Sequence, residues 1–395
     1  MEQTIKELGI YISDGNYSSK YPRSEEFVEE GVPFIRGNNM VDYDITDEEM
    51  YYITPEKHAL LLKGHIKAGD VLITTRGNIG QVAIVPKRHE NSNINAQIVL
   101  LRTNPEKLYN RYLLWALQSN RSKEQYLALQ TGTALKQLPV GKLEQLSIKI
   151  TNINMQHGIA DILDKVYAVI RLRRKELQLF DDLIKARFVE MFGDMYLNSK
   201  GWPEAKLESM ADVVSGITKG RKTKAEDLTE VPYMAVSNVK DGYIDWTTVK
   251  TIEATQQEIE KYRLLADDVL MTEGGDPDKV GRGAIIKEPF ENCIHQNHIF
   301  RVRLDESMMR PEFFAEYLQH QRSKRYFLGC AKQTTGIASI NMTQLRALPV
   351  LMPPLSRQEE FVLFKAQVNK SKVAVQAALD KAQLLFDSLM QKYFE

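Results

Sequence analysis

Polar side chains of the types that read nucleotide bases stand near the ends of several predicted strands. In the major groove of DNA, Arg pairs with guanine, Asn or Gln with adenine, and a carboxylate with cytosine. The same residue types also cap turns, so a structural role remains open for each of them. The candidates are Arg36, Asn38, Arg76, Asn78, Asn95 and Gln97 in the first half of the chain, and Asn238, Lys279, Arg282, His295, Gln296 and Asn297 in the second.

Basic and hydroxyl side chains form a second group, which could bind phosphate. Such contacts position a nucleic acid without reading its sequence, and backbone amides around a glycine can bind an anion. A solvated loop or a tight turn is the structural alternative in each case. The candidates are Lys219, Arg221, Lys222 and Lys224 in the segment TKGRKTK, and Thr131, Lys136 and Thr335 in the segments QTGTALK and QTTGIAS.

Catalytic motifs are missing from the sequence. It contains no GxxxxGK[ST] phosphate loop and no HExxH pair among its seven histidines. The string Met352-Pro353-Pro354-Leu355 lacks the polar first residue and the aromatic last residue of a methyltransferase tetrad. Cys293 and Cys330 are too few for a zinc site or a disulfide framework. We therefore expect no catalytic residue, no metal and no cofactor.

Composition fits a soluble globular protein but does not by itself suggest nucleic-acid binding. Lys plus Arg equals Asp plus Glu at 52 each, whereas a DNA-binding surface must neutralise phosphates. Positive charge must therefore gather locally or come from partner proteins. No apolar run is long enough to span a bilayer, and the N-terminus has no secretory signal, so we expect a cytoplasmic location and no membrane partner.

The chain repeats itself once, at an offset of about 200 residues. GVPFIRGNNM corresponds to EVPYMAVSNV, and KAGDVLITTRGNIGQVAIV corresponds to LADDVLMTEGGDPDKVGRGAII, which aligns Gly80 with Gly281. Three further blocks follow in the same order: NINAQIVLLR with CIHQNHIFRVR, YLLWALQSNRSK with FFAEYLQHQRSK, and LQTGTALKQL with KQTTGIASI. Five blocks in one order indicate a duplicated domain. Short β-rich runs between turns, with one or two helices, predict an α+β fold for each copy.

Each copy ends in a long predicted helix with apolar residues at alternating steps of four and three, which is typical of a coiled-coil seam. Arg173 and Arg187 interrupt the first seam, and Lys365 and Lys372 the second. Because a helix of this length is not stable alone, each needs a partner, and the other helix is the obvious one. The expected contacts between the helices or with partner proteins are Leu163, Ile170, Leu177 and Ile184 in the first helix, and Val368, Val375, Leu379 and Leu389 in the second.

With these motifs the chain resembles the specificity (S) subunits of type I restriction-modification systems. The likeness rests on the opening WPEAKLESMADVVSG, the Val-Pro-aromatic blocks, the GDVL and DDVL strands, the Thr-Gly segments and the passage LPVLMPPLSRQEEF. It covers nearly the whole chain. The first copy departs from the pattern, because it begins with TIKELGIYISDG and carries LSIKITNINMQHGIA in place of the Pro-Pro passage.

The resemblance implies two tandem target-recognition domains separated by two long helices that form an antiparallel coiled coil. Each domain would read one half of a split, asymmetric site in double-stranded DNA. The helices would bind two modification (methyltransferase) subunits, which restriction subunits join. The subunit itself would be non-catalytic, although the assembled complex would methylate adenine and cleave DNA. Expected boundaries are residues 1–152, 153–193 (helix), 194–201 (linker), 202–355 and 356–395 (helix).

Two other functions stay open at this point. A protein-interaction scaffold with duplicated ligand-binding domains would not bind DNA, and the balanced charge is compatible with that function. The chain could also be the detached recognition half of a fused restriction enzyme. DNA affinity that falls steeply with salt would favour DNA recognition over the scaffold.

Overall fold

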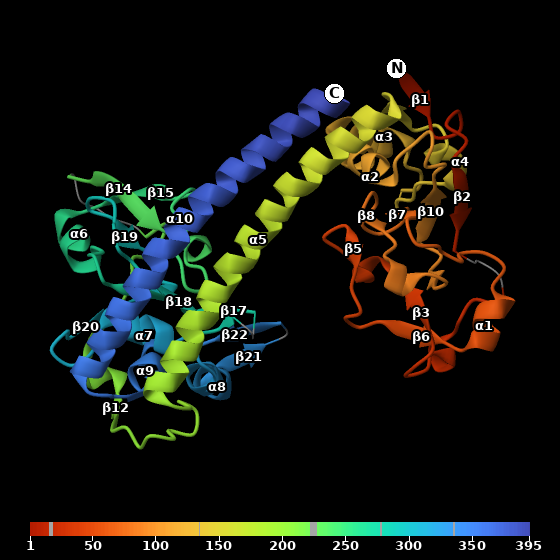
Figure 1. Cartoon of the computed structure of the whole chain (residues 1–395). Coiled ribbons are helices and arrows are strands. Elements are labelled where there is room, and N and C mark those ends of the chain that lie inside the picture. The colour runs from red at the N-terminus through yellow and green to blue at the C-terminus, as the bar shows by residue number, and fades with distance from the viewer. Residues whose placement is uncertain (16–18, 134, 222–226, 277–278, 335) are drawn as a thin grey trace. The chain divides into compact units, whose positions relative to one another are not determined.

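A computed structural model describes residues 1–15, 19–133, 135–221, 227–276, 279–334 and 336–395. The chain forms two compact units (Figure 1). The first unit contains Met1–Leu177 and Ala374–Glu395, and the second contains Gln178–Val373. Among the described residues, every helix is too short or too polar to cross a bilayer.

The first unit combines a central antiparallel sheet with smaller sheets and short helices. Its strands are β1 (Glu2–Thr4), β2 (Tyr11–Asp14), β3 (Val32–Ile35), β4 (Met40–Val41), β5 (Asp44–Ile45), β6 (Tyr51–Ile53), β7 (Val71–Thr74), β8 (Val82–Ile84), β9 (Asn93–Ile94), β10 (Ile98–Arg102) and β11 (Ser147–Lys149). Its helices are α1 (Pro55–Leu60), α2 (Asn110–Gln118), α3 (Asn120–Leu129) and α4 (Val140–Leu143), with single 3-10 turns at Ser24–Glu26, Gly37–Asn39 and Lys87–His89.

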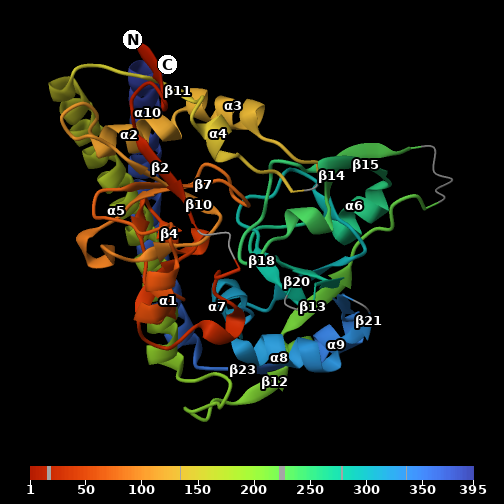
Figure 2. The ribbon, with the colours of Figure 1, turned by 90° about the vertical axis from the view of Figure 1, so that its right-hand side faces the viewer.

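The central sheet of the first unit is buried on both faces. Its strand order is β2-β10-β7-β8, and Figures 1 and 2 show β2, β10 and β7 side by side. Alternate residues point to opposite faces, so Ile73 and Val99 pack with helix α2, whereas Leu72 and Leu100 pack with Ile35 and its neighbours. Burial on both faces explains why residues 71–73 and 98–101 are continuous apolar runs, VLI and IVLL.

The second unit repeats the main sheets and helices of this architecture. Its strands are β12 (Glu204–Lys206), β13 (Ala211–Ser215), β14 (Thr229–Met234), β15 (Lys250–Ala254), β16 (Val269–Thr272), β17 (Gly274–Gly275), β18 (Gly283–Ile285), β19 (Ile294–His295), β20 (Ile299–Leu304), β21 (Lys332–Thr334), β22 (Ile337–Ser339) and β23 (Pro349–Leu351). Its helices are α6 (Gln256–Tyr262), α7 (Pro311–Tyr317), α8 (Gln321–Cys330) and α9 (Met342–Arg346), with 3-10 turns at Leu207–Ser209 and Val236–Asn238. The order β13-β20-β16-β18 matches the central sheet of the first unit, and β15-β14-β19 matches β6-β3-β9.

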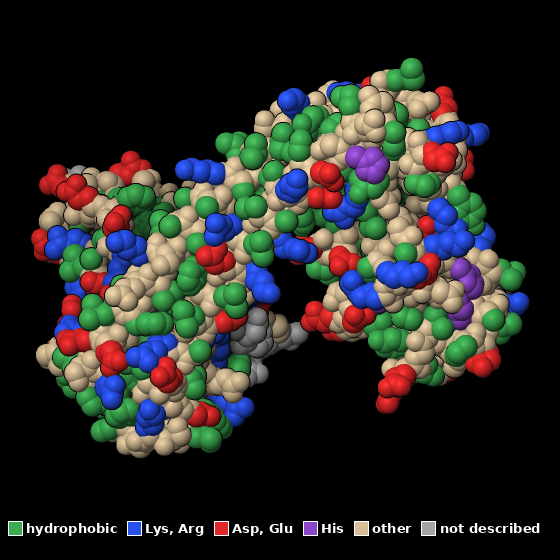
Figure 3. All heavy atoms as spheres, viewed as in Figure 1, with side chains coloured by type: hydrophobic (Ala, Val, Ile, Leu, Met, Phe, Trp, Pro, Cys, Tyr) green, Lys and Arg blue, Asp and Glu red, His purple; other side chains and the backbone are tan. Residues whose placement is uncertain are grey.

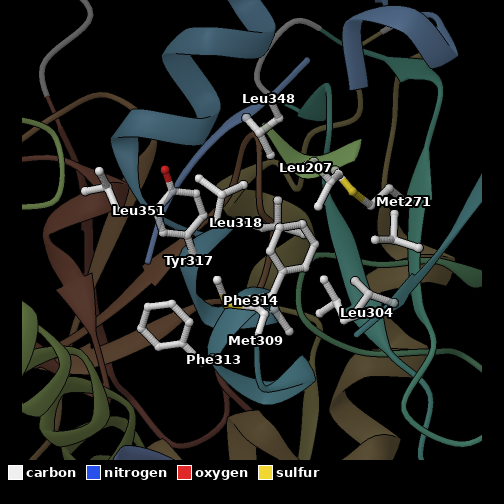
Figure 4. Packing of buried hydrophobic residues seen from close by; sticks show 14 of the residues in the cluster. Leu207, Met271, Leu304, Met309, Phe313, Phe314, Tyr317, Leu318, Leu348 and Leu351 are labelled. Atoms are coloured by element: carbon white, nitrogen blue, oxygen red, sulfur yellow. The ribbon is translucent and has the colours of Figure 1, made fainter. Parts of the chain in front are cut away.

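Helix α7 covers the central sheet of the second unit. Figure 4 shows its Phe313, Phe314 and Tyr317 among aliphatic side chains such as Met271 and Leu304, which come from strands β16 and β20. All five side chains are buried. Helix α2 holds the same place in the first unit, so each unit has a core of its own.

A buried ion pair occurs at the same point of both units. Asp70 is 2% exposed and accepts two hydrogen bonds of 2.7 Å from the Arg102 guanidinium. Asp268, 1% exposed, accepts two of 2.7 and 2.8 Å from Arg303. These carboxylates raise the pKa of Arg102 and Arg303, because they favour the charged guanidinium. The matching pairs confirm the duplication that the sequence predicts.

The long helices are α5 (Ile153–Phe192) and α10 (Leu355–Phe394), and each contributes to both units. In the second unit, Asp181 pairs with Lys372 at 2.5 Å and Arg187 with Glu360 at 2.8 Å. A later residue of α5 therefore pairs with an earlier residue of α10. The two helices run antiparallel, as predicted.

The apolar seam residues of the two helices are buried or half-buried, as their heptad spacing predicts. The structure buries Leu163, Ile170, Ile184, Val368 and Val375 and leaves Leu177, Leu379 and Leu389 half-buried. The four charged seam positions each have an ion-pair partner: Arg173 with Glu176, Arg187 with Glu190 and Glu360, Lys365 with Glu316, and Lys372 with Asp181. Charge at these positions is therefore compatible with the packed helix pair.

Candidate nucleic-acid interface

Four loops of the first unit meet at one edge of its sheets. The amide of Thr75 donates a hydrogen bond to the Gln97 carbonyl at 2.8 Å, and the amide of Leu138 donates to the Thr75 carbonyl at 2.9 Å. The Asn95 amide donates to the Ile35 carbonyl at 2.8 Å. These bonds hold the loops that contain residues 36–38, 76–79, 95–97 and 131–137 next to one another. We call this surface the first loop face.

The second unit forms the same surface with different side chains. The amide of Glu273 donates to the His298 carbonyl at 3.0 Å, and the amide of Ile340 donates to the Glu273 carbonyl at 2.8 Å. The Gln296 amide donates to the Met234 carbonyl at 3.0 Å. Glu273 therefore corresponds to Thr75, His298 to Gln97, and Gln296 to Asn95. We call this surface, which contains Glu273, Gln296 and His298, the second loop face.

Most of the candidate residues of the first loop face are available to a ligand. Asn38, Asn78, Gln97, Thr131 and Lys136 are exposed. Arg76 is half-buried, and its backbone bridges to Gln137, which joins two of the loops. Arg36 is half-buried as well, with its guanidinium 3.5 Å from the centre of the Tyr51 ring and one amino group donating to the Glu49 carbonyl at 2.6 Å. The fold thus brings seven of the predicted DNA-binding residues to one surface.

Asn95 and Asn238 are structural residues, not base readers. Asn95 is 6% exposed, and its Oδ1 accepts from the Gln97 amide at 3.1 Å. Asn238 is fully buried, and its Oδ1 accepts from the Ala235 amide at 2.9 Å while its Nδ2 donates to the Asp245 carbonyl at 2.9 Å. A buried side chain cannot reach a base edge. The prediction of DNA contact was therefore wrong for both, and the turn-capping alternative holds.

His295 is also unsuited to reading DNA. It is fully buried, and its ring nitrogens lie 3.1 Å from the Tyr262 carbonyl and 3.3 Å from the Val214 carbonyl. Burial lowers the pKa of its imidazole to about 4, because a charged ring would be desolvated. His295 is therefore a neutral core residue, and its prediction as a base reader was wrong.

Arg221 is already neutralised by a carboxylate. Its Nε and Nη2 each donate to Glu258 at 2.6 Å, and Nη2 also donates to the Glu253 carbonyl at 3.1 Å. Its guanidinium lowers the pKa of Glu258 to about 2. This pairing leaves Arg221 less available to phosphate than the prediction assumed. Lys219 is exposed, whereas the candidates Lys222, Lys224 and Thr335 lie outside the described residues.

The remaining candidates of the second unit lie on or beside its loop face. Gln296 is half-buried, and its Oε1 accepts from the Val236 amide at 3.4 Å. Asn297 is half-buried with its Nδ2 3.5 Å from Nε2 of His298. Lys279 is exposed and pairs with Asp276. Arg282 is half-buried.

Three residues on or near these faces were missed by sequence reasoning. Glu273 and His298 line a hollow of about 350 Å³ on the second loop face, together with Val236, Gly274 and Ser339. Lys123 lines a hollow of about 390 Å³ that also includes Asn78 of the first loop face. The duplicated blocks carried a signal for all three, because they align Glu273 with Thr75, His298 with Gln97, and Lys123 with Lys324.

Charge on the surface is mixed. Figure 3 shows Lys and Arg side chains interspersed with Asp and Glu side chains over the face that it draws, in agreement with the balanced totals. Among the described residues, no group of three or more His, Cys, Asp or Glu side chains could hold a metal ion.

Comparison with known proteins gives one consistent family. The model of the type I restriction modification DNA specificity domain matches residues 15–179 and again residues 199–378. The type I restriction enzyme EcoKI specificity subunit of Escherichia coli (strain K12) is 22% identical over 387 residues, which cover 92% of this chain and 82% of that protein. The StySPI specificity subunit of Salmonella potsdam is 23% identical over 388 residues, which cover 92% and 81%.

Solved structures show the same fold. The type I restriction-modification S subunit from M. genitalium superposes with a TM-score of 0.59 at 16% identity, covering 100% of this chain and 96% of that one. A chain from a study of complex assembly and conformational transition of the type I system superposes with a TM-score of 0.57 at 16% identity, covering 100% and 97%.

Proposed function

This chain belongs to the type I restriction-modification DNA specificity family, and we propose that it selects the DNA sequence on which a type I restriction-modification complex acts. The observation that carries this proposal is the combination of a duplicated framework with divergent loop faces. The backbone hydrogen bonds among the loops are equivalent in the two units, whereas the side chains that they present differ. Two such surfaces suit a target with two unlike halves.

Each unit would read one half-site in the major groove. In the first unit the readers are drawn from Arg36, Asn38, Arg76, Asn78 and Gln97, with Thr131 and Lys136 placed for phosphate. In the second unit the candidates are Gln296, Asn297, Arg282 and Lys279, with Lys219 placed for phosphate. Bidentate pairing of Arg with guanine and of Asn or Gln with adenine supplies the discrimination.

The long helices would connect the two readers and dock partners. We assign residues 153–193 and 356–395 to this role, and residues 1–152 and 202–355, joined by the linker 194–201, to recognition. The seam residues are buried or half-buried, so partners would bind the outer faces of the helices. Leu172 and Leu384 are 61% and 72% exposed there. The proposed partners are two modification subunits, which restriction subunits join. Adenine methylation and DNA cleavage would belong to those subunits and take place in the cytoplasm.

DNA affinity of the assembled complex, measured across salt concentrations, tests this function against the protein-scaffold alternative. Each phosphate contact releases counterions, so log K should fall linearly with log salt. A matched control is the complex with Lys136 and Lys219 both changed to Gln, which should show a shallower slope. An assembled complex without measurable DNA affinity even at low salt would support the scaffold instead.

A further inference from the structure

Glu273 and His298 form a fixed polar pair on the second loop face. Oε2 of Glu273 lies 2.5 Å from Nδ1 of His298, and the two side chains are 33% and 56% exposed. Their backbones are hydrogen-bonded to each other, and Gly274, next to Glu273, pairs with Ser339 in a small sheet. The carboxylate therefore stands at a hollow with its position set by two elements of the framework.

The imidazole leaves one side of the carboxylate open. Nδ1 of His298 faces Oε2, and the Asn297 amide lies 3.5 Å from the other ring nitrogen. Within the described ranges, Oε1 of Glu273 receives no hydrogen bond. A carboxylate has acceptors only, so this oxygen can accept one hydrogen bond from a donor that enters the hollow.

The equivalent position of the first unit has a different character. Thr75 is 6% exposed and its hydroxyl donates to the Gln97 carbonyl at 3.2 Å, so it presents no acceptor to a ligand. The next residue is Arg76 in the first unit and Gly274 in the second. The first loop face thus carries a cationic residue after this position, whereas the second carries an anionic residue at this position, followed by a glycine.

The chemistry of the base edges leaves one group as the best hydrogen-bond donor to Oε1 of Glu273. In the major groove the exocyclic amines of cytosine and adenine are the donors. Adenine carries its N7 acceptor beside the amine, and a carboxylate would be repelled by that lone pair. Cytosine has no acceptor next to its amine on that edge. A carboxylate is therefore complementary to cytosine.

We propose that Glu273 is a specificity-determining residue that accepts a hydrogen bond from the exocyclic amine of a cytosine in the half-site read by the second unit. His298 is a positioning residue, which orients the carboxylate through Oε2. This inference rests on the proposed function, because it assigns a base to a residue of that same surface.

The test uses the full chain, co-expressed with its modification subunit, and the methylated motif read genome-wide. Glu273→Gln should relax one position of one half of the motif from cytosine toward adenine, because an amide pairs with adenine. The preference at that position should fall about 5- to 150-fold, the range for one base contact. His298→Gln should keep the base but reduce the preference, and Glu208→Gln, an exposed carboxylate outside the loop face, should change nothing.

Two results would overturn the proposal. One is a Glu273→Gln motif identical to that of the wild type at every position. The other is a uniform loss of methylation at all positions, which indicates a structural role for the pair. If methylation in cells that lack this chain keeps the same motif, the function proposed above fails instead, so the two failures are distinguishable.

Discussion

Removing the carboxylate of one of the two equivalent ion pairs should lower the free energy of unfolding of the unit that contains it. Asp268→Ala removes the two hydrogen bonds that the Arg303 guanidinium donates to this carboxylate, and it removes the 2.7 Å bond that the Leu265 amide donates to it. Only the 3.3 Å bond to the Arg263 carbonyl is left to the guanidinium within the described residues. Breaking a buried pair from one side costs about 3–5 kcal/mol. The Arg303 side chain is 37% exposed, so solvent screening reduces this to about 2–4 kcal/mol.

Urea unfolding measures this loss. At a slope of about 3 kcal/mol per molar urea, a loss of 3 kcal/mol moves the midpoint by about 1 M. Asp70→Ala in the first unit is the matched variant, because Asp70 has the same geometry and also accepts from the Lys67 amide at 2.8 Å. Glu208→Ala breaks an exposed 3.6 Å pair with Lys206 and should cost less than about 1 kcal/mol. Losses below about 1 kcal/mol for both Asp variants would refute the reasoning.

Three further predictions rest on single features. Gly281→Ala should lower the free energy of unfolding by about 1–3 kcal/mol in thermal unfolding, because φ is +69° and the added Cβ would overlap the Phe327 ring; a neutral result would refute the close approach. Arg221 holds the pKa of Glu258 at about 2, below its ordinary 4.5, so the advantage of the wild type over Glu258→Gln should be present above pH 4.5 and disappear as pH falls toward 2. Its size should be about 1–2 kcal/mol after screening, and a difference in unfolding free energy that does not vary with pH would contradict it. Four residues inserted in both long helices add about 6 Å, so the unread spacer of the DNA target should lengthen by one to two base pairs of ~3.4 Å each; methylome mapping would show an unchanged spacer if the helices do not set it.

The sequence predicts the framework well, because the framework depends on patterns that repeat. The GDVL and DDVL segments that contain Asp70 and Asp268 align directly, and the structure places both carboxylates in equivalent ion pairs. The two long helices follow from heptad spacing alone. Even their charged seam positions are explained by partners on the same or the facing helix, or on α7 in the case of Lys365.

The loop faces could be predicted only in part, because residue type does not reveal burial. Asn38 and Asn39 are neighbours, yet one is exposed and the other is a buried cap, as is Asn238. Arg221 looked free because Glu258, its partner, lies 37 positions away in the sequence. Glu273 was missed although carboxylates were recognised as readers of cytosine, because the sequence does not show which carboxylates stand on a loop face.

Genome-wide mapping of methylated adenines tests the central claim most directly. The chain is co-expressed with its modification subunit, and residues 1–150 are then replaced by the corresponding segment of another specificity subunit. The proposed function predicts a split motif in which one half changes with the replaced segment while the other half stays the same. A motif that persists unchanged after the replacement, or without the chain altogether, would contradict it.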